Sequence, residues 1–285
     1  MVQRTGGGKV IAAYVEDVKR GPEFLGMARE ISLHKPVIVW KGGTTHQGCM
    51  AAASHTGALA IASEIWEGMT RQAGIIPADS ITDIMNLSRA LLWQSLPQGP
   101  NVGLISPGGG ASVILTDCSI RAGLGVPLLE PSTQAERSIF IARVNTIVHN
   151  PVDLGAASYL PQTLERTLKV MGRDKAIHSL ILCQDLYPFN DGGGWELHGK
   201  YLRTVQETRR SNGKPVYVAL FGPFQNFPEP DQVRREIKGL LHDLKISYAD
   251  DLESCTRMVR RVWDCSRWLR SGKGEGTIAG RVASN

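Results

Sequence analysis

Residues 35–59 read KPVIVWKGGTTHQGCMAAASHTGAL. The run at 37–40 is apolar without polar alternation, which predicts a strand covered on both faces, as in a parallel sheet. A Gly-rich loop then leads to His55, and a helical pattern begins after it. Ligands of open parallel sheets collect at the carboxyl ends of the strands, which is where Glu16, Lys41 and the loop to His55 are expected to lie. The stretch therefore predicts an α/β fold with His55 in a ligand-binding loop.

His55 lies in a run of small residues, which lets a bulky anionic group approach its ring. Ser54 or Thr56 can cap the following helix, whose first N–H groups are unpaired and carry about half a positive charge. Such a site suits a phosphate or a phosphorylated imidazole. The residues alone fit an ordinary, partly buried histidine in a tight turn as well. His46 is the rival nucleophile on the same loop, and its bulkier neighbours rank it below His55.

Several segments together resemble the NDP-forming acyl-CoA synthetases, the succinyl-CoA synthetase superfamily. Residues 35–43, Gly48 and residues 51–60 resemble the phosphohistidine segment of that family. Upstream, the YVE of 14–16 resembles the strand end that supplies the glutamate holding the phosphohistidine ring. Downstream, ISPGGGA at 105–111 and NPVDL at 150–154 resemble the opening and the middle of the next domain. The resemblance covers residues 9–268.

The resemblance implies a role for each residue of the candidate site. His55 is the expected phosphoryl carrier, and Glu16 the carboxylate that fixes the ring tautomer and stabilises the substituted imidazolium. The family holds the phosphohistidine between two helix N-termini without a metal, which implies phosphate-binding positions at Thr56, Gly57, Gly108, Gly109, Gly110 and Ala111. The residues alone also fit a solvent-exposed Glu16 and a glycine turn made for steric reasons. Asp17 competes with Glu16, but strand alternation points it to the opposite side.

The segment NPVD at 150–153 fits a structural role as well as a functional one. Pro151 fixes the backbone, and Asn150 and Asp153 can bond to turn amides. These bonds would shape a loop near the phosphate without touching it.

The length of 285 residues and the 42% apolar content favour two packed domains. Alternating strands and helices predict doubly wound parallel sheets, with PQGP at 97–100 as the linker. The resemblance implies two flavodoxin-like three-layer domains, the first one incomplete. The expected ranges are a partial domain with the phosphohistidine loop at 1–96, a second domain at 101–270 and a mobile tail at 271–285. Strands are expected at 10–15, 37–40, 75–76, 102–106, 126–129, 179–183, 216–221 and 246–248.

Composition argues against several other classes of protein. The five cysteines are odd in number and form no C-x-x-C pair, so we expect neither a disulfide framework nor a zinc site, and reduced thiols suggest the cytoplasm. The chain has no apolar run of about 18 residues and no signal-peptide core, so no membrane is expected. The net charge of +5 is spread among mixed charges without interleaved aromatic residues. We therefore expect no nucleic acid, although a basic surface suits nucleotide or CoA phosphates.

The function implied by the resemblance is that of a fragment or subunit of an NDP-forming acyl-CoA synthetase. Such an enzyme converts acyl-CoA, NDP and phosphate to the carboxylate, NTP and CoA through the phosphohistidine. CoA, ADP or ATP and Mg²⁺ are expected as substrates of the complete enzyme, with none bound by this chain alone. The expected partners are CoA-binding and ATP-grasp domains or subunits, and turnover is expected only with them. An exposed sheet edge, where an earlier strand of the family belongs, favours an oligomer.

Two alternatives remain open. The first is a non-catalytic CoA- or nucleotide-binding or interaction module that keeps the fold without turnover; Thr44, where the family usually has a basic residue, is one departure. The second is a hydrolase built on Ser54 or Ser106. It is disfavoured because the chain has no G-x-S-x-G elbow and Pro107 follows Ser106.

Overall fold

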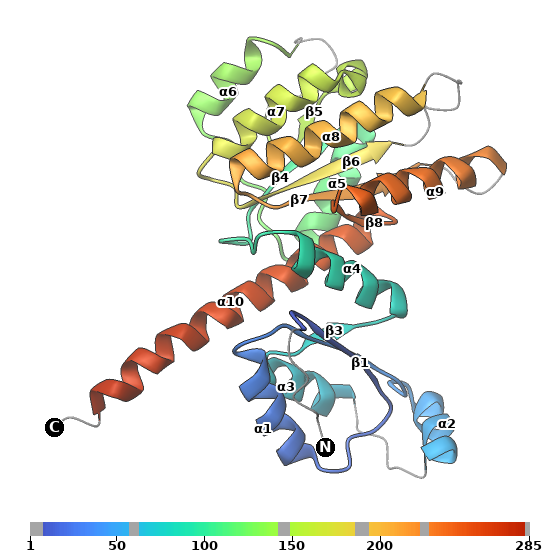
Figure 1. The fold of residues 1–285 in the computed structure, drawn as a ribbon, viewed down its shortest axis with the longest axis vertical. Helices are drawn as coiled ribbons and strands as arrows, with labels where there is room; N and C mark the ends of the chain where they lie inside the picture. The colour runs from blue at the N-terminus through green and yellow to red at the C-terminus, as the bar shows by residue number, and fades with distance from the viewer. Residues whose placement is uncertain (1–7, 57–62, 142–148, 186–193, 223–227, 283–285) are drawn as a thin grey trace. The chain divides into compact units, whose positions relative to one another are not determined.

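The computed structural model describes residues 8–56, 63–141, 149–185, 194–222 and 228–282. The chain divides into two compact units (Figure 1). Unit 1 comprises Met1–Leu92 together with Asp264–Asn285, and unit 2 comprises Trp93–Trp263. The domain ranges 1–96 and 101–270 stay a prediction.

Unit 1 contains a three-stranded parallel sheet in the order β1-β2-β3, with β1 at Ile11–Val15, β2 at Val37–Lys41 and β3 at Ile76–Ala78. Helix α1 (Gly21–Ser32) joins β1 to β2, helices α2 (His46–Thr56) and α3 (Ser63–Ala73) lie between β2 and β3, and α4 (Ile81–Trp93) follows β3. Val37 and Val39 of β2 pack in one cluster with Ala28 of α1 and Trp66 of α3. The apolar run at 37–40 therefore forms the buried parallel strand that the sequence predicts.

Unit 2 contains a five-stranded parallel sheet in the order β5-β4-β6-β7-β8. Its strands are β4 (Val102–Ser106), β5 (Val152–Asp153), β6 (Ser179–Asp185), β7 (Val216–Phe221) and β8 (Ser247–Ala249). Its helices are α5 (Gly109–Arg121), α6 (Pro131–Ser138), the short 3-10 helix η1 (Gly155–Tyr159), α7 (Pro161–Arg173), α8 (Gly194–Asn212), α9 (Pro228–Asp243) and the first part of α10 (Leu252–Val282). Figure 1 shows α7 and α8 side by side on one face of the sheet and α5 on the other. The doubly wound parallel architecture is confirmed.

The strand expected at 126–129 does not form. Only an isolated bridge between Asn101 and Gly125 precedes this segment. Pro127 interrupts the apolar run because it has no N–H to donate to a ladder, and its carbonyl accepts a hydrogen bond from Asn150 Nδ2 at 3.0 Å instead. The short strand β5, which the sequence pattern did not indicate, takes the sheet edge beside β4.

The strand and helix β3-α4 of unit 1 correspond to β8 and the start of α10 in unit 2. In both pairs, the helix begins at the third residue after the last residue of the strand. Gly74 and Lys245 precede these strands at equivalent positions, and both have positive φ, 63° and 53°. The identical residues are Ile75 and Ile246, Ala78 and Ala249, Asp79 and Asp250, Arg89 and Arg260, and Ser95 and Ser266. By strand pairing, β1 and β2 then correspond to β6 and β7.

The part of α10 that begins at Asp264 belongs to unit 1, where Trp268 packs against α1 and Ala73. The indole Nε1 of Trp268 donates to Ser32 Oγ at 2.9 Å, and Ser32 Oγ donates to the carbonyl of Ala73 at 2.5 Å. Gly74, at φ 63°, lies so close that a Cβ there would overlap the Trp268 indole. Helix α10 continues to Val282, through most of the range expected as a tail. The mobility of that range stays a prediction.

Candidate active site

The carboxyl ends of β1 and β2 meet through a buried lysine. Lys41 is only 5% exposed, and its Nζ donates to the backbone carbonyl of Glu16 at 2.8 Å and to that of Gly42. The N–H of Gly42 donates in turn to the carbonyl of Val15 at 2.9 Å. Sequence reasoning placed Lys41 at this end of the sheet, but it did not foresee that the ammonium group would hold the backbone at Glu16.

The carboxylate of Glu16 lies beside an aromatic residue. Tyr14 donates its hydroxyl proton to Glu16 Oε1 at 3.2 Å, and partial burial together with this hydrogen bond raises the pKa of Tyr14. Gly42 permits the arrangement, since a Cβ at this position would overlap the Tyr14 hydroxyl. Tyr14 also contacts Trp40 edge to face, with ring centroids 4.9 Å apart. The site therefore combines an oriented carboxylate, a phenol and a buried ammonium at one end of the sheet.

The segment before His55 is a helix, not the loop that the sequence predicts. α2 begins at His46, and Thr45 Oγ1 accepts a hydrogen bond from the N–H of Gly48 at 3.1 Å, as an N-capping residue does. Ser54 belongs to α2 itself: its Oγ donates to the carbonyl of Met50 at 2.9 Å, one turn back in this helix. Thr45 and the three alanines at 51–53 were the signals for this helix, because alanine has the highest helix propensity.

The expected phosphoryl carrier lies in the last turn of α2. The helix includes His55 and Thr56, whose side chains are outside the described part of the structure, as is Gly57. The rival His46 stands at the other end of α2 and is exposed. The two histidines are therefore separated by about two and a half turns of one helix. Whether the ring of His55 approaches Glu16 stays a prediction.

In unit 2, β4 leads through Ser106 and Pro107 into the glycine turn. Gly108 is the N-cap residue of α5, and the first turn of this helix has no acidic side chain. The glycines at 109 and 110 are exposed, while Ala111 is buried. The free N–H groups at this helix start can therefore approach an anion, with the helix dipole adding to the attraction.

Two buried hydroxyls fix this turn from beneath. Ser106 Oγ lies 2.5 Å from Ser112 Oγ and donates to the carbonyl of Gly108 at 3.2 Å. Both serines are 1% exposed. Ser106 is thus a structural residue of the turn, which removes the geometric basis for a Ser106 hydrolase.

The segment NPVD shapes the neighbouring loop. Asn150 Oδ1 accepts from the N–H of Leu104 at 2.8 Å, and its Nδ2 donates to the carbonyl of Val102 at 2.8 Å, so it joins this segment to β4. Asp153 Oδ1 accepts from the N–H of Gly155 at 2.8 Å. The other oxygen of this carboxylate, Oδ2, lies beside Gly109, 3.6 Å from the place that a Cβ would occupy there. Both side chains therefore shape the backbone near the glycine turn.

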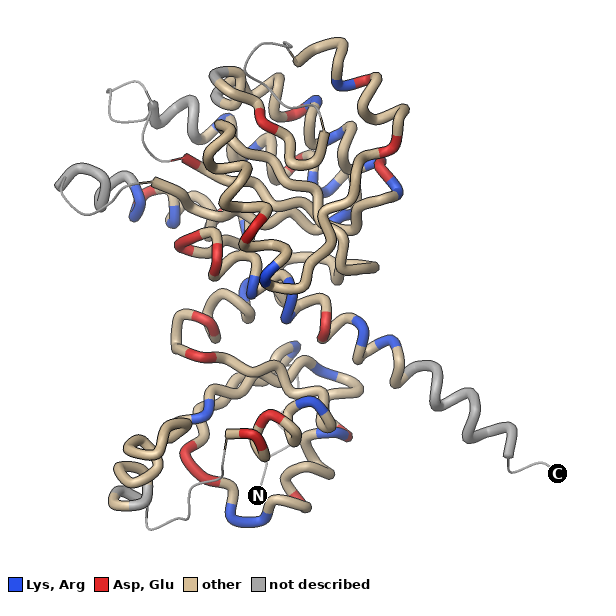
Figure 2. Tube along the Cα trace, turned by 180° about the vertical axis from the view of Figure 1, so that it is seen from behind, with Lys and Arg blue, Asp and Glu red and all other residues tan. Residues whose placement is uncertain are grey.

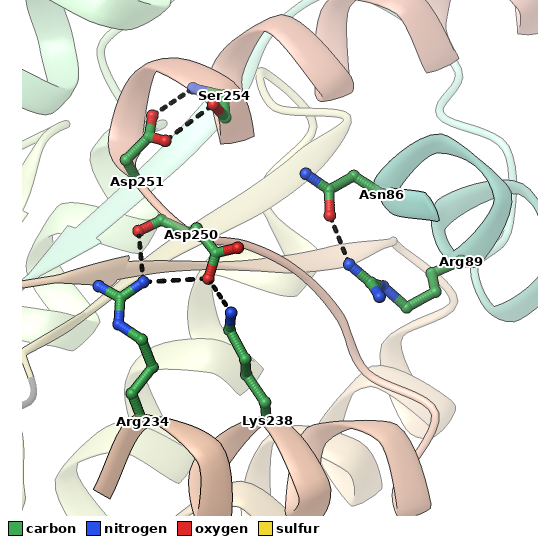
Figure 3. A network of polar contacts seen from close by, with 7 residues as sticks. All are labelled: Asn86, Arg89, Arg234, Lys238, Asp250, Asp251 and Ser254. Atoms are coloured by element: carbon green, nitrogen blue, oxygen red, sulfur yellow. Dashed lines mark hydrogen bonds and ion pairs between the residues drawn. The ribbon is translucent and has the colours of Figure 1, made fainter. Parts of the chain in front are cut away.

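Two basic residues of α9 form structural ion pairs with the aspartate that follows β8 (Figure 3). Asp250 Oδ1 contacts Arg234 at 3.0 Å and Lys238 at 2.5 Å, which joins α9 to β8. Asp251 then begins α10, since its Oδ1 accepts from the N–H of Ser254 at 2.6 Å. Figure 2 shows Lys and Arg interspersed with Asp and Glu over the described trace, in line with the mixed charges of the sequence.

Membrane-spanning helices and metal-binding clusters are both absent from the described ranges. None of the helices in these ranges combines the length and the apolarity that crossing a bilayer requires. No group of three or more described His, Cys, Asp or Glu side chains could hold a metal ion.

Two family models match the chain in succession. Residues 2–91 match the succinyl-CoA ligase like flavodoxin domain, and residues 102–223 match the Ligase-CoA domain. Both matches agree with the α/β units described above.

Curated relatives and a solved structure match most of the chain. The chain is 40% identical over 272 residues to the alpha subunit of the ADP-forming acetate–CoA ligase I of Pyrococcus furiosus, which is 93% of this chain and 54% of the relative. The chain is 35% identical over 213 residues to the alpha subunit of the ADP-forming acetate–CoA ligase II of the same organism. This match covers 75% of this chain and 45% of the relative. The structure of the dinucleotide forming acetyl-coenzyme A synthetase 1 of Ca. Korarchaeum cryptofilum, in complex with phosphate and ADP, matches with a TM-score of 0.76 and 25% identity over 93% of this chain and 55% of that chain.

The chain thus spans about half the length of the curated relatives it matches. Its two matched domains follow one another in the order that the sequence motifs predict. The chain therefore contains a succinyl-CoA ligase like flavodoxin domain followed by a Ligase-CoA domain, and it is homologous to alpha subunits of ADP-forming acetate–CoA ligases.

Proposed function

We propose that this chain is a part of an NDP-forming acyl-CoA synthetase in which His55 carries the phosphoryl group between two half-reactions. The observation that carries the proposal is the succession of the two domain matches, joined to relatives whose names describe alpha subunits of ADP-forming acetate–CoA ligases. A covalent carrier suits such a reaction because it lets the acyl and nucleotide steps occur in different places.

In the first step, a ring nitrogen of His55 attacks the phosphorus of an acyl phosphate, and the carboxylate leaves with the bonding electron pair. Glu16 accepts a hydrogen bond from the other ring nitrogen, so that the attacking nitrogen is unprotonated, and it stabilises the imidazolium that forms. The phosphoryl group then passes to an oxygen of NDP, and neutral imidazole is the leaving group. The fixed position of Glu16 supports this role, since Lys41 holds its backbone and Tyr14 bonds to its carboxylate.

We assign phosphate-binding roles to the N–H groups of Gly108, Gly109, Gly110 and Ala111 at the start of α5, and to Thr56 and Gly57, which follow His55 in the sequence. The uncapped start of α5 supports the first half of the assignment. An isolated helix start contributes about 0.3 to 1 kcal/mol per charge, so several N–H bonds must act together to hold a dianion.

The complete enzyme would use CoA, ADP or ATP and Mg²⁺ as substrates and would include CoA-binding and ATP-grasp domains or subunits. The names of the relatives, alpha subunits of ADP-forming ligases, support this composition. The five free cysteines favour the cytoplasm as its compartment.

Phosphohistidine detection tests the proposal. The chain is incubated with acetyl phosphate, or with ATP and a candidate partner subunit, and the acid-labile label is counted. We expect label on the wild-type chain and on His46→Ala, the matched control on the same helix, and none on His55→Ala. Label that survives in His55→Ala would refute the carrier role, and absence of label from every variant under both conditions would favour a binding module without chemistry.

A further inference from the structure

The carboxylate of Asp153 lies at the end of the unit 2 sheet where the glycine turn begins. Asp153 and Ser106 are partners in the parallel ladder of β5 and β4, and each is the last residue of its strand. The N–H of Leu154 donates to the carbonyl of Ser106 at 3.0 Å, which keeps the two strand ends together. This pairing places Oδ2 of Asp153 beside Gly109, the first residue of α5.

One oxygen of this carboxylate is bonded and the other is open. Oδ1 accepts from the N–H of Gly155 at 2.8 Å, which fixes the orientation of the group. Oδ2 has no hydrogen bond or ion pair with any residue that the structure describes, although Asp153 is only 5% exposed. Asp174 makes the same two-residue turn in unit 2 but uses both oxygens, which accept from the N–H groups of Ala176 and Glu130 at 2.8 Å each. The open oxygen of Asp153 is therefore not a general feature of such turns.

Hydrogen-bond donors and an acceptor converge at the start of α5. The N–H groups of the first helical turn have no partner within the helix and attract an anion. The ionised carboxylate beside them can only accept a hydrogen bond. An anion without a proton would place its oxygens against Oδ2, and two negative charges so close repel each other. An oxyanion that keeps a proton can instead accept from the N–H groups with its bare oxygens and donate its O–H to Oδ2.

We propose that Asp153 is a specificity-determining residue of the phosphate site at the start of α5, where it accepts the P–OH hydrogen of inorganic phosphate and disfavours oxyanions without a proton. The inference rests on the phosphate-binding role proposed above for this helix start and names the form of the anion that binds there. Hydrogen phosphate keeps one proton at neutral pH. Sulfate has the same shape and the same charge but no proton, so the open oxygen distinguishes the two ions.

Equilibrium dialysis of the chain against radiolabelled phosphate or sulfate, at neutral pH and without a phosphoryl donor, measures this preference. The wild type should bind phosphate at least about a hundredfold more tightly than sulfate, because a site that hydrogen-bonds a ligand hydroxyl rejects an analogue without one. Arsenate keeps a proton as phosphate does, so it should displace labelled phosphate with an affinity within about threefold of that of phosphate. Both measurements use the wild type alone and do not depend on the folding of a variant.

Asp153→Asn retains the turn and changes the open atom from an acceptor to a donor. Its Oδ1 still accepts from Gly155, so the amide nitrogen takes the place of Oδ2 and donates to a bare oxygen. The preference for phosphate over sulfate should therefore fall to about threefold or less. Asp117→Asn is the matched control, because it removes the same charge from an exposed position on α5, and it should keep the wild-type preference.

The anion preference and the labelling of His55 can fail separately. A wild type that binds no phosphate, binds sulfate equally well or excludes arsenate would overturn the inference. A preference that survives in Asp153→Asn, or that Asp117→Asn loses to the same degree, would overturn it as well. Label on His55 alongside any of these results would leave the carrier role standing. The expected preference without label on His55 would refute the carrier role and retain Asp153 as the residue that selects phosphate.

Discussion

The ammonium group of Lys41 donates to the backbone carbonyl of Glu16 at 2.8 Å and so ties the carboxyl end of β2 to that of β1. The side chain is 5% exposed, and its described hydrogen bonds go to backbone carbonyls, not to a carboxylate. The buried ammonium group thus compensates its burial with backbone carbonyls and holds the two strand ends together.

Replacement of this lysine should destabilise unit 1. Lys41→Met keeps the length of the side chain but leaves the carbonyls of Glu16 and Gly42 without their donor, which we expect to lower the free energy of unfolding by about 1 to 3 kcal/mol. Urea denaturation measures the change. Lys19→Met, at an exposed position, is the control and should change stability by no more than about 0.5 kcal/mol. An equal effect of the two substitutions would show that Lys41 does not hold the strand ends.

The carboxylates at 16 and 17 should differ in their effect on phosphorylation. Glu16→Gln removes the charge that stabilises the substituted imidazolium, so the rate of labelling should fall by about a hundredfold with little loss of stability. Asp17→Asn removes the neighbouring charge, which strand alternation predicts to lie on the opposite side, and should leave the rate within about twofold. Quench-flow measurement of acid-labile label gives both rates, and equal rates would exclude an orienting role for Glu16.

Substitution of two glycines separates the cost of backbone strain from the cost of a packing collision. Gly213 has φ 72° with no atom within 4 Å of the place that an alanine methyl group would occupy, so Gly213→Ala should cost only the left-handed strain, about 1 to 2 kcal/mol. Gly74→Ala adds a collision with the Trp268 indole and should cost at least about 2 kcal/mol more. Thermal denaturation of both variants tests the docking of the residues after Asp264 in unit 1. Equal losses would contradict that docking.

Buried thiols should make the protein sensitive to alkaline pH. Burial raises the pKa of Cys265 from 9.0 to about 12, and burial raises the pKa of Cys183 and Cys255 as well. The unfolded chain releases these protons at lower pH than the folded chain does. Stability is therefore fully present below about pH 9 and is lost as the pH rises toward 12, by about 1.4 kcal/mol per pH unit for each thiol.

In the variant Cys265→Ala, the free energy of unfolding should fall less steeply with rising pH than in the wild type. Urea midpoints at several pH values between 8 and 11 give the slope for the wild type and the variant. If the two slopes coincide, Cys265 titrates alike in the folded and unfolded chain.

The strands were predictable where their burial is complete. β4 and β7 have the bounds that the sequence predicts, because continuous apolar runs leave no other place for these residues than a sheet covered on both faces. The error at 126–129 has the same origin: a run of apolar residues predicts a strand there, although Pro127 cannot donate to a ladder. β5 has no counterpart in the predicted strands because a two-residue strand has no periodicity to detect.

The candidate site was predictable in part. Parallel topology brings Glu16 and Lys41 to one end of the sheet, and this followed from two short apolar runs alone. The helix that contains His55 did not follow, because the glycines and threonines just before it resemble a loop while its alanines favour a helix. The hydrogen bonds of Lys41 and of the two serines beneath the glycine turn depend on tertiary contacts, which no local pattern encodes.

The measurement that tests the central claim most directly is the location of the phosphoryl group on the labelled wild-type chain. Peptides prepared at neutral to alkaline pH and fragmented by electron transfer, which spares the acid-labile bond, identify the modified residue. We predict a single phosphorylated residue, His55. Phosphate on His46 or Ser54 instead would contradict the account.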